Sequence, residues 1–287
     1  MLVNLATILS PAVDSHYSVA CFNVFGWEDA MAVVDAAAQL GAPVILAATL
    51  DLRKFMPVDV IAVMLRSLAQ RAPVPVCVHL DHTYELDEVF RAVDLGFTSV
   101  MFDGSQLPLE QNIAGTRRVV QYAHAAACSV EAEIGSVPYA EGRAHIKTEL
   151  TEVGDAVRLA GETGLDAMAV SVGNVHRLTS PSAVIDFALL GRICAAVTVP
   201  LVIHGTSGIR DQDIARLART RVAKFNIGTV LRQAFGRGLR EGLGRHAERF
   251  DRLEIMRDVM STVCCEAMRM IRLLGWPEGS ATPSAQS

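Results

Sequence analysis

Residues 74–105 read VPVCVHLDHTYELDEVFRAVDLGFTSVMFDGS and contain one complete strand–helix–strand unit. The unit begins with a β-rich apolar run over Val74–Leu80, continues with helical periodicity over Glu85–Leu95, and ends with a second apolar run over Ser99–Phe102. Two strands joined by a helix are typical of a parallel sheet, because parallel strands need a long crossover connection. Each strand ends in polar residues, His79–His82 for the first and Asp103–Ser105 for the second.

The same alternation recurs on both sides of this unit. Eight strands are predicted, at Ser18–Asn23, Pro43–Ala48, Val74–Leu80, Ser99–Phe102, Ser129–Ile134, Ala167–Ser171, Leu201–His204 and Ala223–Asn226. Helices are predicted at Glu28–Leu40, Val58–Arg71, Glu85–Leu95, Asn112–Ala127, Val153–Thr163, Ala183–Ala196, Asp211–Arg219 and Thr229–Gly242. Eight such units predict an α/β fold, the closed (β/α)8 TIM barrel. A doubly wound open sheet is the alternative, but no G-x-G-x-x-G turn follows the first strand, which argues against a dinucleotide-binding domain.

Three segments lie outside the repeat. A helical segment precedes the first strand, and Gly135–Leu150 is too long for an ordinary strand–helix loop, so we expect a loop over the active-site face. Leu253–Leu274 predicts one or two extra C-terminal helices. We expect a single domain over residues 1–275 and a disordered tail over residues 276–287, which are rich in Ser, Ala and Pro.

The composition narrows the class of protein. The chain has 287 residues, half of them apolar, and a net charge of -5, which gives no basic surface for nucleic acid. Its six cysteines show no CxxC spacing, so buried thiols in a reducing cytoplasm are expected rather than disulfides. No signal-type segment and no run of about 20 apolar residues is present, so we expect no membrane association.

Three histidines follow predicted strands whose ends converge on one face of a parallel barrel. His82, His176 and His204 come at the ends of strands three, six and seven. Neutral imidazoles can bind a divalent metal and leave a position open for substrate. One such histidine alone would more often be structural, but three beside carboxylates favour a catalytic metal site. His79 is expected to be structural, and no role is assigned to His16, His124, His145 or His246.

Carboxylates gather at the same strand ends. Asp81 could act as a general acid or base on a substrate hydroxyl, or could orient an imidazole, and the residues alone leave both roles open. Asp103, Glu131 and Glu133 could hold a second cation, position the histidines or form structural ion pairs.

Two glycine-containing turns precede predicted helices, His204–Gly208 after strand seven and Asn226–Thr229 after strand eight. Backbone N–H groups at helix N-termini suit a phosphate dianion, and barrels commonly bind phosphate after these two strands. The turns therefore predict a phosphate site.

At these residues the sequence resembles the class II, metal-dependent ketose-bisphosphate aldolase family, which includes fructose- and tagatose-bisphosphate aldolases. The matching segments are Cys21–Asn23, Ala42–Leu46, His79–His82, Ser99–Ser105, Val130–Gly135, Gly173–His176, Pro200–Gly205 and Lys224–Ile227. Their order and spacing hold over residues 17–275.

The resemblance implies a role for each matching residue. It places a catalytic metal, zinc or another divalent ion, on His82, His176 and His204, with Asp103 and Glu133 near an alternative metal position. It makes Asp81 the acid/base at the C4 hydroxyl of a phosphorylated ketose and Glu141 the residue that exchanges the proton at the donor carbon. It implies phosphate and substrate contacts from Asn23, Thr49, Gly205, Ser207, Asn226, Thr229, Arg177 and Arg257, of which Arg257 would meet the far phosphate of a bisphosphate.

The resemblance further implies that the metal polarises the ketone and stabilises an enediolate, with dihydroxyacetone phosphate or a similar ketone as the donor. It also allows a monovalent cation and implies a homodimer or homotetramer.

The sequence departs from the family pattern at three places. Pro138-Tyr139 replaces a glycine pair in the loop after strand five, which weakens the assignment of Glu141. Arg177 stands where the family has a glycine after the metal histidine, and could contact a phosphate or carboxylate or could block the usual donor. Gly228 stands where fructose-bisphosphate enzymes often have an aspartate, so the sugar is left open.

The sequence is also compatible with two other functions. A Schiff-base aldolase could use Lys224, one of three lysines with Lys54 and Lys147, but would leave the histidines without a role. A non-catalytic, metal-binding or chaperone-like relative of an aldolase is the other alternative, because fold does not determine function.

Overall fold

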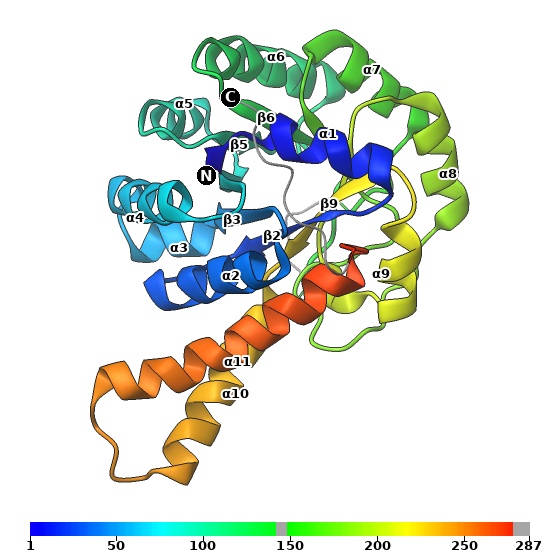
Figure 1. Ribbon diagram of the computed structural model, residues 1–287. Helices are drawn as coiled ribbons and strands as arrows, with labels where there is room; N and C mark the ends of the chain where they lie inside the picture. The colour runs from blue at the N-terminus through cyan, green and yellow to red at the C-terminus, as the bar shows by residue number, and fades with distance from the viewer. Residues whose placement is uncertain (142–147, 278–287) are drawn as a thin grey trace.

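The computed structural model of the protein describes residues 1–141 and 148–277 (Figure 1). Eight parallel strands form its centre: β2 (Val19–Asn23), β3 (Val44–Ala48), β4 (Val76–Thr83), β5 (Ser99–Phe102), β6 (Ser129–Ile134), β7 (Ala167–Val170), β8 (Leu201–Ile203) and β9 (Val222–Ile227). Each strand pairs with the next in chain order, and β9 pairs with β2, which closes the sheet. The predicted (β/α)8 barrel is confirmed, and its eight predicted strands are β2 to β9.

Helices cover the outer face of the barrel. They are α2 (Trp27–Leu40), α3 (Leu50–Phe55), α4 (Val58–Arg71), α5 (Leu86–Asp94), α6 (Leu109–Ala125), α7 (Val153–Thr163), α8 (Phe187–Ala196), α9 (Asp211–Leu217) and α10 (Thr229–Arg245), with a short 3-10 turn, η1 (Thr206–Gly208), before α9. β3 and β7 are wholly apolar and buried on both faces, as is usual for parallel strands between a core and a helical layer, whereas β4, β6 and β9 also carry buried polar and charged residues.

Some helix boundaries differ from those predicted. The short helix α3 was not predicted, because six residues are too few to show a clear period. α8 begins at Phe187 rather than Ala183, because Asp186 caps it by accepting a hydrogen bond from the Leu189 amide. α6 begins at Leu109, directly after Pro108, three residues before the predicted start.

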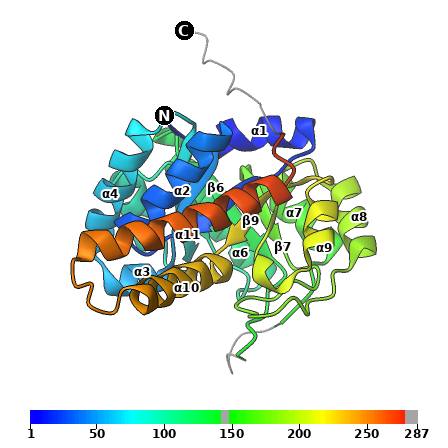
Figure 2. The same cartoon turned by 60° about the horizontal axis from the view of Figure 1, so that its bottom comes forward.

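The N-terminal segment closes one end of the barrel. β1 (Leu2–Val3) pairs with β4, and α1 (Leu5–Ser15) contacts β2, β4, β6 and β9. Leu5, Ile8 and Leu9 on α1 belong to one buried cluster with the inward-facing apolar residues of the strands. In Figure 2 this helix lies at the top, and α3 and α10 lie toward the opposite end. The open end of the barrel is therefore the one at which the strands finish.

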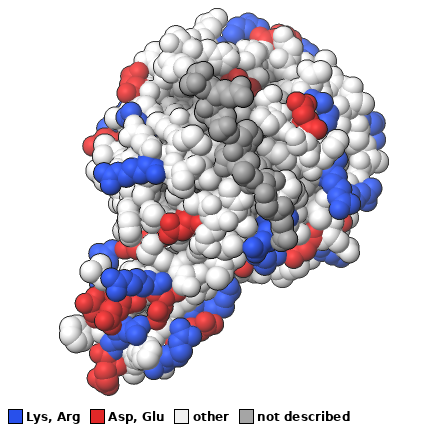
Figure 3. Space-filling model, viewed as in Figure 1, with Lys and Arg blue, Asp and Glu red and all other residues white. Residues whose placement is uncertain are grey.

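At the C-terminal end of the chain, α10 and α11 (Arg252–Leu273) pack against each other and extend from the barrel as an arm (Figure 1). α11 is the single helix found in the segment predicted to hold one or two. Positive and negative side chains are mixed on the tip of the arm (Figure 3). No described helix has the length and apolar character needed to cross a bilayer.

Trp276 lies inside the segment predicted to be a disordered tail, yet it is packed. Its indole Nε1 donates to the Leu40 carbonyl at 2.9 Å, and its ring meets the edge of Tyr17. Residues 278–287 of that tail, like His145 and Lys147, lie outside the described residues.

Candidate active site

Three histidines from separate strand ends meet at the open end of the barrel. His82 is the second-to-last residue of β4, His176 lies in the loop after β7, and His204 comes directly after β8. One ring nitrogen of each lies within 4.8 Å of the others, and the ring centroids are 4.7–5.6 Å apart. The structure thus brings together three residues that are far apart in the sequence, in the way that parallel barrels allow.

Two of these histidines direct nitrogen atoms at each other. His82 Nε2 and His204 Nδ1 are 3.0 Å apart. The other nitrogen of each ring meets a carboxylate, Asp103 at 2.8 Å from His82 and Glu131 at 2.9 Å from His204. Because a carboxylate only accepts hydrogen bonds, it selects the tautomer in which the nitrogen beside it carries the hydrogen. In the metal-free protein a proton on His82 Nε2 bridges the 3.0 Å to His204 Nδ1, and a cation that replaced this proton would receive the lone pairs of both facing nitrogens.

The charges around the three rings differ. Burial lowers the pKa values of His176 and His204 well below the usual value, so both rings are neutral, as metal ligands must be. Burial also opposes protonation of His82, but the charge of Asp81 and the hydrogen bond that His82 donates to Asp103 outweigh burial and raise the pKa of His82. The bond to His82 in turn overcomes burial and lowers the pKa of Asp103 to about 2.

A second group of possible ligands shares His82. One ligand atom each from His82, Asp103 and Glu133 lies within 4.8 Å of the other two. Burial, followed by the charge of Asp103, raises the pKa of Glu133 to about 8. Among the described residues, the Oε2 atom of Glu133 is buried without a hydrogen-bond partner. A cation bound beside Asp103 and Glu133 would satisfy this oxygen, so the donor set fits a second ion position.

The strand end that carries His82 has an unusual backbone, held by an arginine. His82 has a φ of 44°, in the left-handed region that non-glycine residues seldom occupy. The buried guanidinium of Arg53, from α3, donates to the carbonyl oxygens of Ala48, Asp81 and His82 at 2.8–2.9 Å. Arg53 therefore stabilises the backbone turn that directs the His82 ring into the site.

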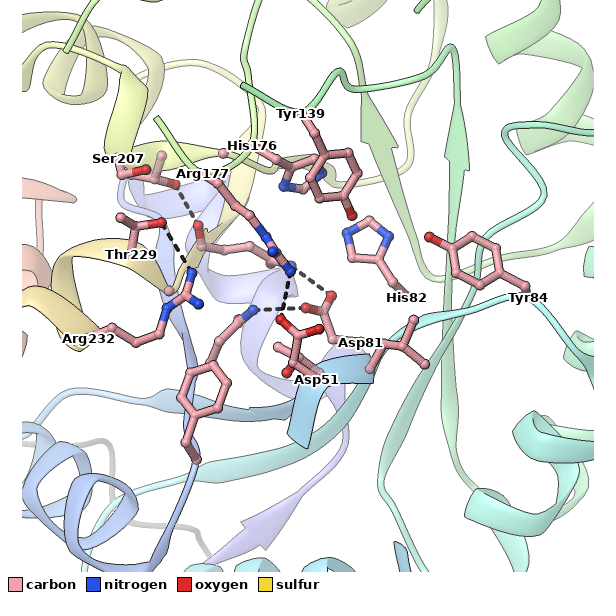
Figure 4. Close-up of a pocket in the computed structure, with 18 residues that line it drawn as sticks. Asp51, Asp81, His82, Tyr84, Tyr139, His176, Arg177, Ser207, Thr229 and Arg232 are labelled. Carbon is pink, nitrogen blue, oxygen red and sulfur yellow. Dashed lines mark hydrogen bonds and ion pairs between the residues drawn. The ribbon is translucent and has the colours of Figure 1, made fainter. Parts of the chain in front are cut away.

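Asp81 is oriented by two amides. Its carboxylate accepts hydrogen bonds from Asn23 Nδ2 at 3.0 Å and from Asn226 Nδ2 at 2.9 Å. Burial would raise its pKa, but His82, then His204, outweigh burial and lower it. Asp81 is thus an ionised, positioned base that lines the cavity beside the histidines (Figure 4).

Behind these groups lies a buried lysine. Lys224 Nζ is 2.7 Å from Glu131 Oε2 and donates to Asn226 Oδ1 at 2.6 Å. Burial alone would lower its pKa, but Cys21, Glu131 and Asp81 more than offset burial and raise it. Lys224 is therefore a charged partner of the groups that position His204 and Asp81. His79, which was expected to be structural, is fully buried and bonds Ser99 Oγ at 2.8 Å.

One cavity contains most of the residues predicted to bind phosphate and substrate. Those that line it are Asn23, Thr49, Arg177, Gly205, Ser207, Asn226 and Thr229, together with the unpredicted residues Asp51, Tyr139 and Arg232. Gly205, with a φ of 71°, allows the chain to pass close to the turn that carries His176, since a Cβ there would lie 2.4 Å from the Val175 carbonyl oxygen.

The two sequence departures beside the cavity contact each other. Tyr139 stacks on His176 with ring centroids 4.6 Å apart, and the His176 amide donates to the Pro138 carbonyl at 2.7 Å. The Arg177 guanidinium lies 5.6 Å from the centre of the Tyr139 ring. The loop after β6 is thus attached directly to a metal-ligand candidate.

Glu141 and Arg257 are among the predicted site residues that do not line this cavity. The Glu141 side chain is 66% exposed, with its nearest charged partner Arg177 at 3.8 Å. Arg257 is exposed on α11. Sequence reasoning missed Arg53, Asp51 and Arg232, which lie in helices rather than at strand ends. Their one detectable signal is that each falls in the first residues of a helix that follows a barrel strand.

Comparison with known proteins gives consistent results. The model of the family described as class II fructose-bisphosphate aldolase matches residues 3–277. The structure of the YdjI aldolase from Escherichia coli K12 superposes with a TM-score of 0.85 at 33% sequence identity, covering 98% of this chain and 100% of that chain. A fructose-bisphosphate aldolase from Campylobacter jejuni gives a TM-score of 0.82 at 22% identity over 95% of each chain, a likeness in fold.

Proposed function

We propose that this chain, which belongs to the class II fructose-bisphosphate aldolase family and is an aldolase, reversibly cleaves a phosphorylated ketose. A divalent metal held by His82, His176 and His204 would assist the cleavage. Zinc is the proposed ion, because three imidazoles with an open position are typical of catalytic zinc sites, and zinc would displace the proton that the raised pKa places on His82. The products would be dihydroxyacetone phosphate, or a similar ketone, and an aldehyde.

The observation that carries the proposal is the 3.0 Å approach of His82 Nε2 to His204 Nδ1, each ring being bonded to a carboxylate on its other side. Carboxylates in this position fix the tautomer and raise the basicity of a metal-binding imidazole. A divalent cation bound here would polarise the ketone oxygen of the substrate.

The proton transfers are assigned to carboxylates of the chain. Asp81, held by Asn23 and Asn226, would remove the proton from the C4 hydroxyl during cleavage and return it during condensation. Among the described residues, Asn23 Oδ1 is buried without a partner, so it can accept a hydrogen bond from a substrate hydroxyl. Glu141 remains the proposed residue for proton exchange at the donor carbon.

The donor phosphate would bind where the two turns meet. Gly205 and Ser207 belong to the turn before α9, and Thr229 begins α10, whose N-terminal amides favour an anion. Thr49 and Asn226 line the same cavity. Asp103 and Glu133 are proposed as an alternative metal position. The proposal also allows a monovalent cation, and binding of a far phosphate by Arg257 stays a prediction.

The alternatives fit the site less well. A Schiff-base mechanism needs a neutral amine, whereas Lys224 is fully buried, ion-paired with Glu131 and held with a raised pKa. A non-catalytic relative would have no need of an acid/base carboxylate held by two amides beside the histidines. A cytoplasmic location and a homodimer or homotetramer complete the proposal.

The test is a retro-aldol screen of phosphorylated ketoses that detects triose phosphate release. We expect turnover with zinc-loaded protein, loss after chelation, and recovery when zinc is restored. Turnover that survives chelation, or trapping of substrate on the protein by borohydride, would contradict the metal mechanism. Metal-loaded protein that cleaves no member of the panel would favour the non-catalytic relative.

A further inference from the structure

Two guanidinium groups line the cavity beside the proposed phosphate turns. Arg177 projects from the loop after β7, and Arg232 projects from the first turn of α10, where its Nη2 lies 3.5 Å from Thr229 Oγ1 (Figure 4). They are near enough to affect each other: partial burial, followed by the charge of Arg177, lowers the pKa of Arg232. An anion between or beside these two cations lowers their mutual repulsion.

Asp51 supplies that anion in the structure described. Its Oδ2 is 2.6 Å from Arg177 Nη2, while Glu141 is a more distant second partner of Arg177 at 3.8 Å. Asp51 lies in the first turn of α3, two residues after the capping Thr49, and its side chain is 44% exposed. Because the Asp51 side chain is nearly half exposed, it can separate from Arg177 and become hydrated with only a small loss of free energy.

Building on the proposed function, we propose that Arg177 and Arg232 together bind the substrate phosphate, and that Asp51 is an internal anion which the phosphate displaces from Arg177. The same cavity also contains Ser207 and Thr229, whose turns offer hydroxyl and amide donors. The displaced carboxylate leaves Arg177 free to form charge-assisted hydrogen bonds with the phosphate.

This arrangement has a consequence for specificity. Arg177 stands where the family pattern has a glycine and keeps a positive φ of 61°, so the exchange adds to the cavity a charged side chain that already has a partner. Replacing Asp51 costs one ion pair, and a dianion that contacts two guanidiniums regains more than a neutral hydroxyl can. The site therefore selects phosphorylated donors over unphosphorylated ones.

The test measures binding of inorganic phosphate to the zinc-loaded protein by calorimetry, with no turnover involved. We expect Asp51→Asn to tighten phosphate binding by about threefold or more, because Arg177 loses its competing partner. Arg232→Gln should weaken binding about tenfold or more. In an Arg177→Gln background, Asp51→Asn should give no gain, because the competition is for Arg177.

A second ion pair gives matched controls. Asp59, in the first turn of α4, lies 3.9 Å from Arg91 and outside the cavity, so Asp59→Asn and Arg91→Gln should leave phosphate affinity unchanged. Zinc content is measured for every variant, and the Asp51→Asn gain should persist when zinc is chelated.

The proposal is overturned if Asp51→Asn fails to tighten binding, if its gain persists without Arg177, or if Arg232→Gln binds phosphate like the parent. A parent protein that shows the full binding pattern but releases no triose phosphate would support the anion site and contradict the proposed reaction.

Discussion

The orientation of the His82 and His204 rings is set by the carboxylate that accepts a hydrogen bond from the ring nitrogen pointing away from the proposed metal position. Asp103 and Glu131 were predicted to lie near the histidines, with positioning as one of three open roles. In the structure each carboxylate bonds the ring nitrogen opposite the one that faces the other histidine. This is the geometry of a carboxylate that orients a metal-binding imidazole. Sequence could not distinguish these roles, because the choice depends on a side-chain direction that the strand pattern does not specify.

Asp81→Ala should slow cleavage by at least about 100-fold, the usual contribution of general acid–base catalysis. Zinc content should stay at the parental value, since Asp81 bonds Asn23 and Asn226 rather than the metal-facing nitrogens. Single-turnover cleavage and metal analysis of the same sample check this. A variant that has lost its zinc would assign Asp81 to the metal site instead.

Glu141→Ala should impair exchange of the donor-carbon proton with solvent more than it impairs zinc binding. The reason is position: the Glu141 side chain is largely exposed beside Arg177 and is not among the candidate metal ligands. Exchange into the donor ketone, followed by NMR in deuterated water, measures the effect. Unchanged exchange would remove Glu141 from the mechanism.

At the scale of elements, the turns after the strands carry the chemistry and the strict backbone requirements. Gly205→Ala should destabilise the protein by roughly 2–4 kcal/mol, because the residue has a positive φ and its Cβ would press on the Val175 carbonyl oxygen. Because Val175 precedes His176, zinc affinity should fall as well.

Gly191→Ala in α8 is the matched control for that variant. A Cβ at Gly191 meets nothing within 4 Å, so this change should stabilise the protein by roughly 0.5–1 kcal/mol. Chemical denaturation measures both variants. Equal stability of the two would contradict the tight turn.

The elements show why some features could be predicted and others could not. All eight strands were located within a few residues, because a strand buried on both faces is a short apolar run ended by polar residues. The histidines and Asp81 followed from the convergence of those strand ends. Arg53 and Arg232 were missed because their long side chains extend from helices into the site, and the hydrophobic pattern of a helix does not show how far a polar side chain reaches.

At the scale of the whole molecule, the barrel encloses an excess of buried acid near its open end. In the metal-free protein, burial and Asp103 raise the pKa of Glu133 from 4.5 to about 8. Between these values the folded state holds a proton that the unfolded state has released, so stability falls as pH rises. This contribution is present below about pH 4.5 and lost as pH passes about 8.

Glu133→Gln should remove that pH dependence. Relative to the parent, the metal-free variant should gain at least about 2 kcal/mol in the free energy of unfolding between pH 5 and pH 8, since each tenfold change in proton affinity is worth about 1.4 kcal/mol. Denaturation at a series of pH values, with chelator present, checks the prediction. Parallel curves for variant and parent would show that Glu133 is ionised throughout.

The central claim is that His82, His176 and His204 hold one divalent cation, and X-ray absorption at the zinc edge tests it most directly. Zinc-loaded protein should bind one ion tightly, with three imidazole nitrogens at roughly 2.0–2.1 Å and no sulfur ligand. His204→Ala should lose this signature, whereas His124→Ala, which alters an exposed histidine paired with Asp166, should keep it. A zinc ion coordinated by cysteine sulfur, or an unchanged spectrum in His204→Ala, would contradict the account.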